Sequence, residues 1–169
     1  MASQVILRPW QRQDAQALTA IANNKKIWNQ VRDRFPSPYT MVDALQWIAF
    51  CEKQQPLQQF CIAVGTQVVG SIGWISQEDV ARKSAEIGYF IGESYWGKGF
   101  ATAAINALTQ HLESEGQLVR LFAHTFAHNK ASMRVLQKAG FYLESIRRKA
   151  AYKNGEILDD YVWVKLIHH

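Results

Sequence analysis

The stretch best suited to chemistry is the segment Gly97-Lys98-Gly99, which stands between a β-rich run and an alanine-rich run. Its glycines let the backbone approach an anion closely, Lys98 adds a positive charge, and Thr102 offers a hydroxyl one turn later. A helix that begins at such a loop directs unpaired N–H groups, and the positive end of its dipole, at one point. The segment therefore predicts a phosphate-binding site.

Two better-known glycine motifs that bind phosphate do not fit this segment. A Walker A loop requires Gly-Lys followed by Ser or Thr, whereas Lys98 is followed by Gly99. A Rossmann fingerprint requires a small residue where Thr102 stands and lies at the end of a first strand. A glycine pair that only turns a strand into a helix remains the alternative.

A second motif lies downstream and gives the first one context. Residues 95–102 are followed by Asn129-Lys130-Ala131-Ser132 and then by residues 136–141. The two motifs in this order resemble the GNAT superfamily of acetyl-CoA-dependent N-acetyltransferases, and within it the RimJ/RimL-like branch. The superfamily's loop pattern, Gln/Arg-x-x-Gly-x-Gly/Ala, falls on Trp96, Gly99 and Ala101, so Trp96 departs from the first position.

The resemblance implies acetyl-CoA as the cosubstrate and no metal. It assigns the edge of a strand to the pantetheine, a loop to the pyrophosphate, and the start of a later helix to the cofactor arm. Those residues are, in the same order, Tyr89, Phe90 and Ile91; Gly97, Lys98, Gly99, Phe100, Ala101 and Thr102; and Asn129 with Ser132. It also makes the region around residues 26–39 one wall of the acceptor site, so Trp28, Arg32, Phe35 and Tyr39 are substrate-binding candidates. These aromatic residues can equally well pack on the core.

Transfer of an acetyl group from a thioester to an amine needs a base, because an alkyl amine is mostly protonated at neutral pH. Backbone N–H groups of a strand can stabilise the oxyanion. Glu86 and His124 are the candidate bases, although each can also be structural. The Tyr that commonly acts as the acid in the family would fall at Leu136, so Ser132 is the candidate acid.

The elements that must position these residues follow from periodicity and turn signals. We expect strands at 5–8, 59–64, 67–75, 83–91, 118–126, 141–151 and 159–167, and helices at 14–22, 40–51, 99–115 and 129–138. Asp14 is expected to cap the first helix, and Thr40 with Asp43 to form a capping box for the second. The order predicts a mixed α/β (α+β) fold with one central sheet. The resemblance implies a GNAT fold, whose mixed, mostly antiparallel sheet is splayed in the middle and flanked by helices.

The composition places the chain among ordinary globular proteins. Its 169 residues suit a single domain over 1–169, with 48% hydrophobic and 20% charged residues. The N-terminus lacks a signal pattern and no segment approaches 18 uninterrupted apolar residues, so we expect a cytoplasmic protein without membrane contact, as a monomer or homodimer. Cys51 and Cys61 are expected to be ordinary thiols.

The net charge of +5 raises the question of nucleic acid, but the basic residues are dispersed. A basic chain also suits the polyphosphate of coenzyme A. His124 and His128 lack the ligand set of a zinc site, and His168 and His169 are either native or tag-derived. Three functions remain: an N-acetyltransferase, a non-catalytic CoA-binding sensor, and a nucleic-acid-binding module. We adopt the first, with direct transfer through a ternary complex to a primary amine, either a protein N-terminus or a small molecule.

Overall fold

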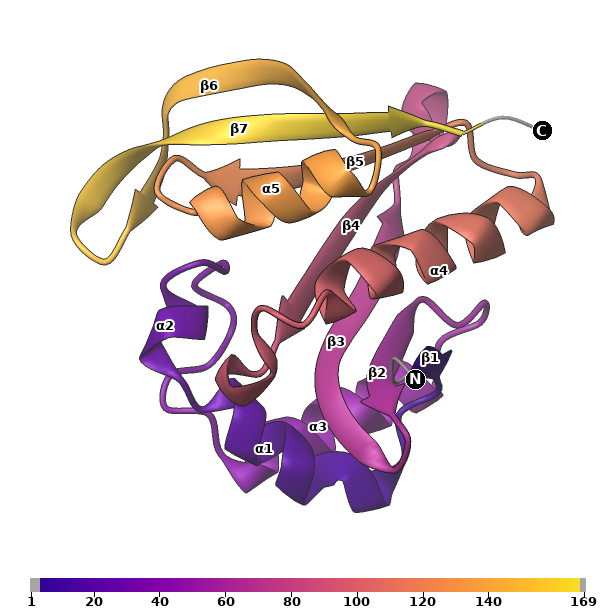
Figure 1. Ribbon diagram of the computed structural model, residues 1–169, viewed down its shortest axis with the longest axis vertical. Coiled ribbons are helices and arrows are strands. Elements are labelled where there is room, and N and C mark those ends of the chain that lie inside the picture. Colours follow the sequence, from indigo (N-terminus) through magenta and orange to yellow (C-terminus); the bar gives the residue numbers. More distant parts are fainter. Residues whose placement is uncertain (1–3, 168–169) are drawn as a thin grey trace. The chain divides into compact units, whose positions relative to one another are not determined.

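The computed structural model describes residues 4–167 and contains one seven-stranded sheet in the order β1-β2-β3-β4-β5-β7-β6 (Figure 1). The strands are β1 (Val5–Arg8), β2 (Gln59–Val64), β3 (Gln67–Ser76), β4 (Ser84–Ile91), β5 (Arg120–Phe126), β6 (Tyr142–Lys153) and β7 (Glu156–Leu166). The α-helices are α1 (Ala15–Ala22), α2 (Lys25–Trp28), α3 (Met41–Glu52), α4 (Phe100–Glu115) and α5 (Lys130–Lys138). Short 3-10 turns are η1 (Arg12–Asp14), η2 (Asp79–Ala81) and η3 (Glu93–Tyr95). His168 and His169 lie outside the described residues.

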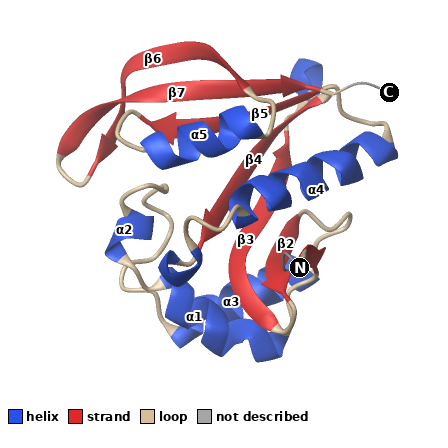
Figure 2. Ribbon diagram, viewed as in Figure 1, coloured by secondary structure: helices blue, strands red, loops and turns tan. Residues whose placement is uncertain are grey.

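The sheet is mixed, as predicted. Antiparallel ladders join β1 to β2, β2 to β3, β5 to β7 and β6 to β7, whereas β4 and β5 run parallel. The parallel register runs from the Ser84/Arg120 pair to the Glu86/Phe122 pair. Helices flank the sheet, so the expected mixed, mostly antiparallel α/β fold is confirmed (Figure 2). The splay between β4 and β5 stays a prediction.

The chain divides into two compact units that exchange segments. The first unit runs to Gly73 and returns at Tyr89–Ala104, and the second takes Trp74–Gly88 and the chain from Ile105 onward. The predicted single domain over residues 1–169 stays a prediction.

The core of the first unit is built from one face of each of two helices and from the strands β2 and β3. On α3, Ala44, Ile48 and Cys51 recur at helical spacing, and all three are buried. They belong to the same buried cluster as Leu18 of α1 and Cys61 of β2. The predicted capping box is confirmed, because Thr40 accepts a hydrogen bond from Asp43 N–H and the Asp43 carboxylate accepts one from Thr40 N–H.

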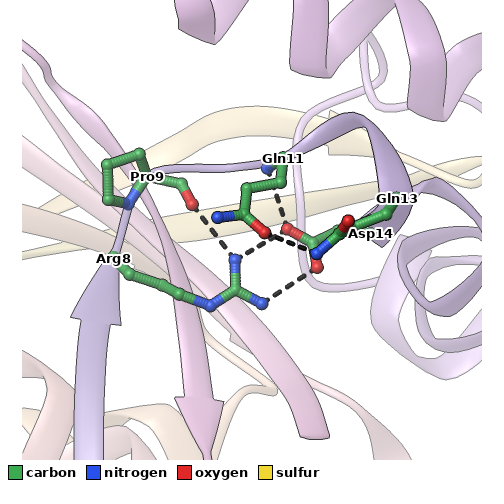
Figure 3. Close-up of polar contacts among 5 residues, drawn as sticks. All are labelled: Arg8, Pro9, Gln11, Gln13 and Asp14. Atoms are coloured by element: carbon green, nitrogen blue, oxygen red, sulfur yellow. Dashed lines mark hydrogen bonds and ion pairs between the residues drawn. The ribbon is translucent and has the colours of Figure 1, made fainter. Parts of the chain in front are cut away.

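Asp14 departs from the prediction, because its side chain does not cap α1. The residue occupies the N-cap position, but its carboxylate instead accepts two hydrogen bonds from the Arg8 guanidinium, at 2.7 and 2.9 Å, and one from Gln11 N–H (Figure 3). A guanidinium matches both oxygens of a carboxylate, so it competes well with the helix N–H groups. The result ties β1 to the start of α1.

In the second unit, β5 alternates between two environments. Leu121, Ala123 and Thr125 are buried, while Phe122 and His124 lie half-buried on the other face of the strand. The buried face includes a hydrogen bond from Trp163 Nε1 to Thr125 Oγ1 at 3.0 Å. Figure 1 shows α5 alongside β5 and β7. Lys165 Nζ of β7 donates a hydrogen bond to the carbonyl of Ala139, the residue after α5, at 2.8 Å.

The last two strands, β6 and β7, form an antiparallel hairpin and are longer than the strands expected at 141–151 and 159–167. Asn154 and Gly155 both have positive φ, 51° and 80°, which is the geometry of a two-residue turn that continues the twist of the strands. The pairing therefore extends to Lys153 and Glu156, which lie outside the expected strands.

Candidate active site

The glycine loop lies in the first unit, between η3 and α4. Gly97 and Gly99 have φ of +74° and +78°, a region that L side chains rarely adopt, and a Cβ added at either would meet nothing within 4 Å. The backbone is therefore open on the side where side chains would stand. Lys98 is exposed, with its Nζ 5.9 Å from the centre of the Tyr95 ring.

Helix α4 begins directly at this loop. The carbonyl of Gly99 accepts the N–H of Ala103 at 3.1 Å, which is the first bond of the helix. Helix geometry supplies no acceptor for the N–H groups of Phe100, Ala101 and Thr102, and Gly99 has no side chain that could cap them. These donors and the positive end of the helix dipole suit a phosphate.

One hydrogen bond joins the loop to the end of β4, and a second joins Gly92, the residue after β4, to β3. Trp96 Nε1 donates to the carbonyl of Ile91 at 2.7 Å, and Gly92 N–H donates to the carbonyl of Val69 at 2.8 Å. The position where the family pattern has Gln or Arg is thus used here to fix the loop. A Cβ at Gly70 would collide with the carbonyl of Phe90, so β3 requires glycine where it passes β4.

Two of the four acceptor candidates lie together with a cofactor candidate. The ring of Phe35 lies 5.2 Å from that of Tyr39 and 5.4 Å from that of Phe90, the second pair edge to face. Tyr39 is only 6% exposed and belongs to the buried cluster, and burial raises its pKa. Tyr39 therefore packs on the core, which was the alternative to a place in the acceptor site.

The other two acceptor candidates lie nearer the surface. Trp28 is half-buried on α2 and carries Lys25 Nζ 4.8 Å from its ring centre, while Arg32 is exposed. The same helix is joined to η3, because Glu93 accepts hydrogen bonds from Lys26 Nζ and Asn24 Nδ2 at 2.6 and 2.7 Å. These two donors hold the pKa of the Glu93 carboxyl below its usual value. The turn before the glycine loop thus contacts the segment that carries the acceptor candidates.

In the second unit, Asn129 caps α5. Its Oδ1 accepts the N–H of Ser132 at 3.2 Å, so both residues lie at the N-terminus of that helix, as predicted. Leu136, in the place of the usual Tyr acid, is fully buried.

The two candidate bases share one face of the sheet. Glu86 of β4 is registered with Phe122 of β5, so the two side chains project from the same face, and His124 follows two residues later on that face. Glu86 and His124 are both half-buried. Phe122 lies beside His124, with ring centres 5.8 Å apart in an edge-to-face arrangement.

His124 also has a charged partner that the sequence analysis missed. Its Nδ1 lies 2.7 Å from Oδ2 of Asp160 on β7, and the same oxygen lies 3.2 Å from Nη1 of Arg147 on β6. The side chain of Asp160 is 8% exposed. The available signal was a pair of acidic residues, Asp159 and Asp160, directly before the apolar run at 161–164, but nothing in the sequence states which residue Asp160 faces.

The remaining features carry no site for the predicted chemistry. A cavity of about 500 Å³ in the first unit is lined by Arg8, Asp14, Gln67 and Tyr95, among others, and by none of the predicted site residues. Among residues 4–167, no group of three or more His, Cys, Asp or Glu side chains could hold a metal ion. No helix within the same range is long and apolar enough to span a membrane.

Comparisons with known proteins agree with the resemblance seen in the sequence. Residues 4–142 match the model of the acetyltransferase (GNAT) domain. The chain is 30% identical over 162 residues to the uncharacterized N-acetyltransferase YoaA of Bacillus subtilis, covering 94% of this chain and 91% of YoaA. It is 30% identical over 110 residues to the ribosomal-protein-serine acetyltransferase of Escherichia coli, covering 65% and 61% of the two chains. The family match over residues 4–142 and the similarity to YoaA confirm the expected acetyltransferase family.

A solved structure shows the same fold with a ligand bound. The self-immunity acetyltransferase MccE for microcin C7, in complex with acetyl-CoA and AMP, superposes with a TM-score of 0.83 at 27% identity, covering 97% of this chain and 93% of that one.

Proposed function

Because this chain belongs to the GNAT family and is an acetyl-CoA-dependent N-acetyltransferase, we propose that it transfers the acetyl group directly to a primary amine, through a ternary complex. The observation that carries this is the open glycine loop at the start of α4. Gly65 in the β2–β3 turn also has positive φ and faces open space, so the glycines alone do not distinguish this loop. What distinguishes it is that α4 begins directly at Gly99, whose missing side chain cannot cap the first N–H groups of the helix.

The cofactor would be held mainly by backbone groups. The N–H groups of residues 97–102 take the pyrophosphate, with the charge of Lys98 nearby, and the backbone of Tyr89, Phe90 and Ile91 takes the pantetheine. Phe90 can pack against Phe35 and contact the pantetheine at the same time, since its ring makes the first contact and its backbone in the strand makes the second. Asn129 and Ser132 at the start of α5 are the remaining cofactor contacts that we propose.

The chemistry requires removal of a proton from the ammonium, attack by the neutral amine and protonation of the leaving sulfur. Glu86 and His124 are the proposed bases, and Ser132 is the proposed acid. The net change converts an ammonium and a thioester into an amide, a thiol and one proton released to solvent. No covalent acetyl-enzyme is needed.

The acceptor remains open between two classes of amine, a protein N-terminus and a small molecule. The E. coli relative is named for a ribosomal protein serine, and another relative from the same organism, 21% identical over 166 residues, is named an L-amino acid N-acetyltransferase. Trp28, Arg32 and Phe35 are the residues proposed to contact the acceptor, with Tyr39 supporting them from the core. A cytoplasmic location and a monomeric or homodimeric state are part of this proposal.

A panel of amines with detection of free thiol tests the activity and separates the two acceptor classes. The panel should pair peptides with free N-terminal Ser or Ala against the same peptides N-acetylated, and add amino acids and polyamines. Thiol release with free peptides alone assigns the protein N-terminus. No thiol release with any member, despite acetyl-CoA binding measured by calorimetry, would favour the sensor alternative.

The cofactor site is tested by Gly99→Val, which places a branched side chain at positive φ in the open loop. We expect the dissociation constant for coenzyme A to rise at least about tenfold, equivalent to about 1.4 kcal/mol. Gly65→Val is the matched control, because Gly65 also has positive φ, +59°, and faces open space, but lies in the β2–β3 turn. Unchanged affinity in a folded Gly99→Val variant would contradict the site.

A further inference from the structure

Three side chains from three strands form a row across one face of the second unit. Arg147 and Asp160 are direct partners in the β6–β7 ladder, and His124 is registered with Val162, two residues beyond Asp160. Asp160 Oδ2 therefore receives contacts from both sides, at 2.7 Å from His124 Nδ1 and 3.2 Å from Arg147 Nη1.

This geometry selects one form of the neutral imidazole. An ionised carboxylate only accepts hydrogen bonds, so a ring nitrogen 2.7 Å away must carry the hydrogen. The neutral ring then has its hydrogen on Nδ1 and a lone pair on Nε2. The guanidinium of Arg147, which is always charged, donates to the same carboxylate oxygen.

Two of the three side chains are largely removed from solvent. The side chain of Asp160 is 8% exposed and that of His124 is 22% exposed. The side chain of Arg147, at the outer end of the row, is 57% exposed. Phe122 packs edge to face against the imidazole and lies under the guanidinium of Arg120, 5.1 Å from its ring centre. The free nitrogen of a ring held in this way has a defined direction.

The inference rests on the proposed acetyl transfer and deepens it. We propose that His124 is the general base and that Asp160 is a positioning residue, which fixes His124 in the tautomer whose Nε2 accepts the proton, with Arg147 securing Asp160. Nε2 takes one proton from the acceptor ammonium and later releases it to solvent. The amine lone pair forms the new N–C bond and the C–S electron pair leaves with sulfur. The Ser132 hydroxyl gives its proton to the sulfur and regains one from the second N–H of the amine.

The first test does not depend on activity. Protein labelled with ¹⁵N-histidine is studied by long-range ¹H–¹⁵N NMR above the pH range in which histidine titrates, and His124→Gln assigns the His124 signals. We expect a protonated Nδ1 and an unprotonated Nε2. The opposite tautomer would overturn the proposal, whether or not the protein acetylates any amine tested.

The second test is kinetic and uses an amine found active in the panel. Asp160→Asn presents an amide that can donate to Nδ1 and so allows the wrong tautomer. We expect kcat to fall at least about tenfold with KM for acetyl-CoA within about twofold, and Asp160→Glu to recover part of the loss. Asp159→Asn is the matched control, since Asp159 is the adjacent carboxylate and pairs instead with Arg148; it should keep the wild-type kcat.

Arg147→Ala serves if Asp160→Asn does not fold, because Arg147 is mostly exposed. It should lower kcat by less than Asp160→Asn and also leave KM for acetyl-CoA unchanged. Wild-type kcat in a folded Asp160→Asn or His124→Gln variant would overturn the role of the row. Absence of turnover in the wild-type protein would count against the proposed function instead, and the NMR result would still decide the tautomer.

Discussion

At the scale of single residues, burial and hydrogen bonding compete for the charge of each titratable side chain. Burial raises the pKa of the Cys51 and Cys61 thiols to about 12, and no sufficient partner opposes it. Burial also disfavours the ionised form of Asp14, but the hydrogen bonds donated by Arg8 and by Gln11 N–H outweigh it and hold its pKa below the usual value. The same kind of environment thus gives neutral thiols and an ionised carboxylate.

Asp14→Asn should lower the free energy of unfolding at pH 7 by about 2–3 kcal/mol, because it leaves the Arg8 guanidinium without its bidentate partner. The folded pKa of Asp14 is lowered, so its contribution is present above the unfolded value and is lost as pH falls through the folded value. Denaturant unfolding should therefore show that the difference in free energy of unfolding between wild type and variant becomes smaller below about pH 4.

The control for this measurement is Asp79→Asn, an exposed aspartate whose positive φ of 53° asparagine tolerates. It should change stability by no more than about 0.5 kcal/mol. If the difference in free energy of unfolding between wild type and Asp14→Asn is as large at pH 3 as at pH 7, the charge of Asp14 does not contribute to stability, and only the shape of its side chain does.

At the scale of elements, two helices begin in different ways. Asn129 caps α5 with its own side chain, whereas α4 begins at Gly99, which has no side chain to offer. A self-capped helix start is structurally complete, and a helix start on a glycine leaves its donors for a ligand. We therefore expect α5 to contribute side chains to the site and α4 to contribute backbone.

Ser132→Ala tests the contribution of α5. The cap uses the backbone N–H of Ser132, so the substitution removes the hydroxyl and leaves the cap intact. If the hydroxyl supplies the proton for the leaving sulfur, kcat should fall about tenfold or more while KM for acetyl-CoA stays within about twofold.

Asn129→Ala should show the reverse pattern, with about 1 kcal/mol of stability lost and weaker use of the cofactor.

Ser114→Ala is the control for Ser132→Ala, since Ser114 lies on α4 with its hydroxyl bonded to the carbonyl of His111. Wild-type turnover in Ser132→Ala would assign the proton to water or to another group.

At the scale of the whole molecule, the chemistry is expected to run without a covalent intermediate. A covalent route would need a thiolate at the site, and the only two cysteines of the chain are buried in the core of the first unit. With pKa values of about 12, both thiols are protonated throughout the neutral range. Direct attack of the amine on the thioester needs no such group.

A Cys51→Ala/Cys61→Ala double variant should therefore keep its turnover with an acceptor from the panel, and initial-rate plots should give intersecting lines. The variant loses two buried sulfurs, so its stability should be checked by thermal unfolding before rates are compared. Parallel lines, or a cysteine found acetylated by mass spectrometry after exposure to acetyl-CoA alone, would refute direct transfer.

The sequence by itself determined the features that depend on near neighbours along the chain. The glycine loop, the Thr40–Asp43 capping box and the Asn129 helix start all follow from backbone preferences over two to four residues. The order of the elements followed from them, and with it the mixed sheet.

Only the tertiary structure decided which side chains meet across strands. Asp160 reaches His124 across 36 positions of sequence and Arg147 across 13, through registers that include two irregularities in β6. The prediction that Asp14 caps a helix was wrong, because the guanidinium that competes for its carboxylate belongs to Arg8 on another element. Local preferences fix where a strand begins and ends, but a shift of one residue in pairing moves every side chain to the other face, so the partner of a buried charge is set by the sheet as a whole.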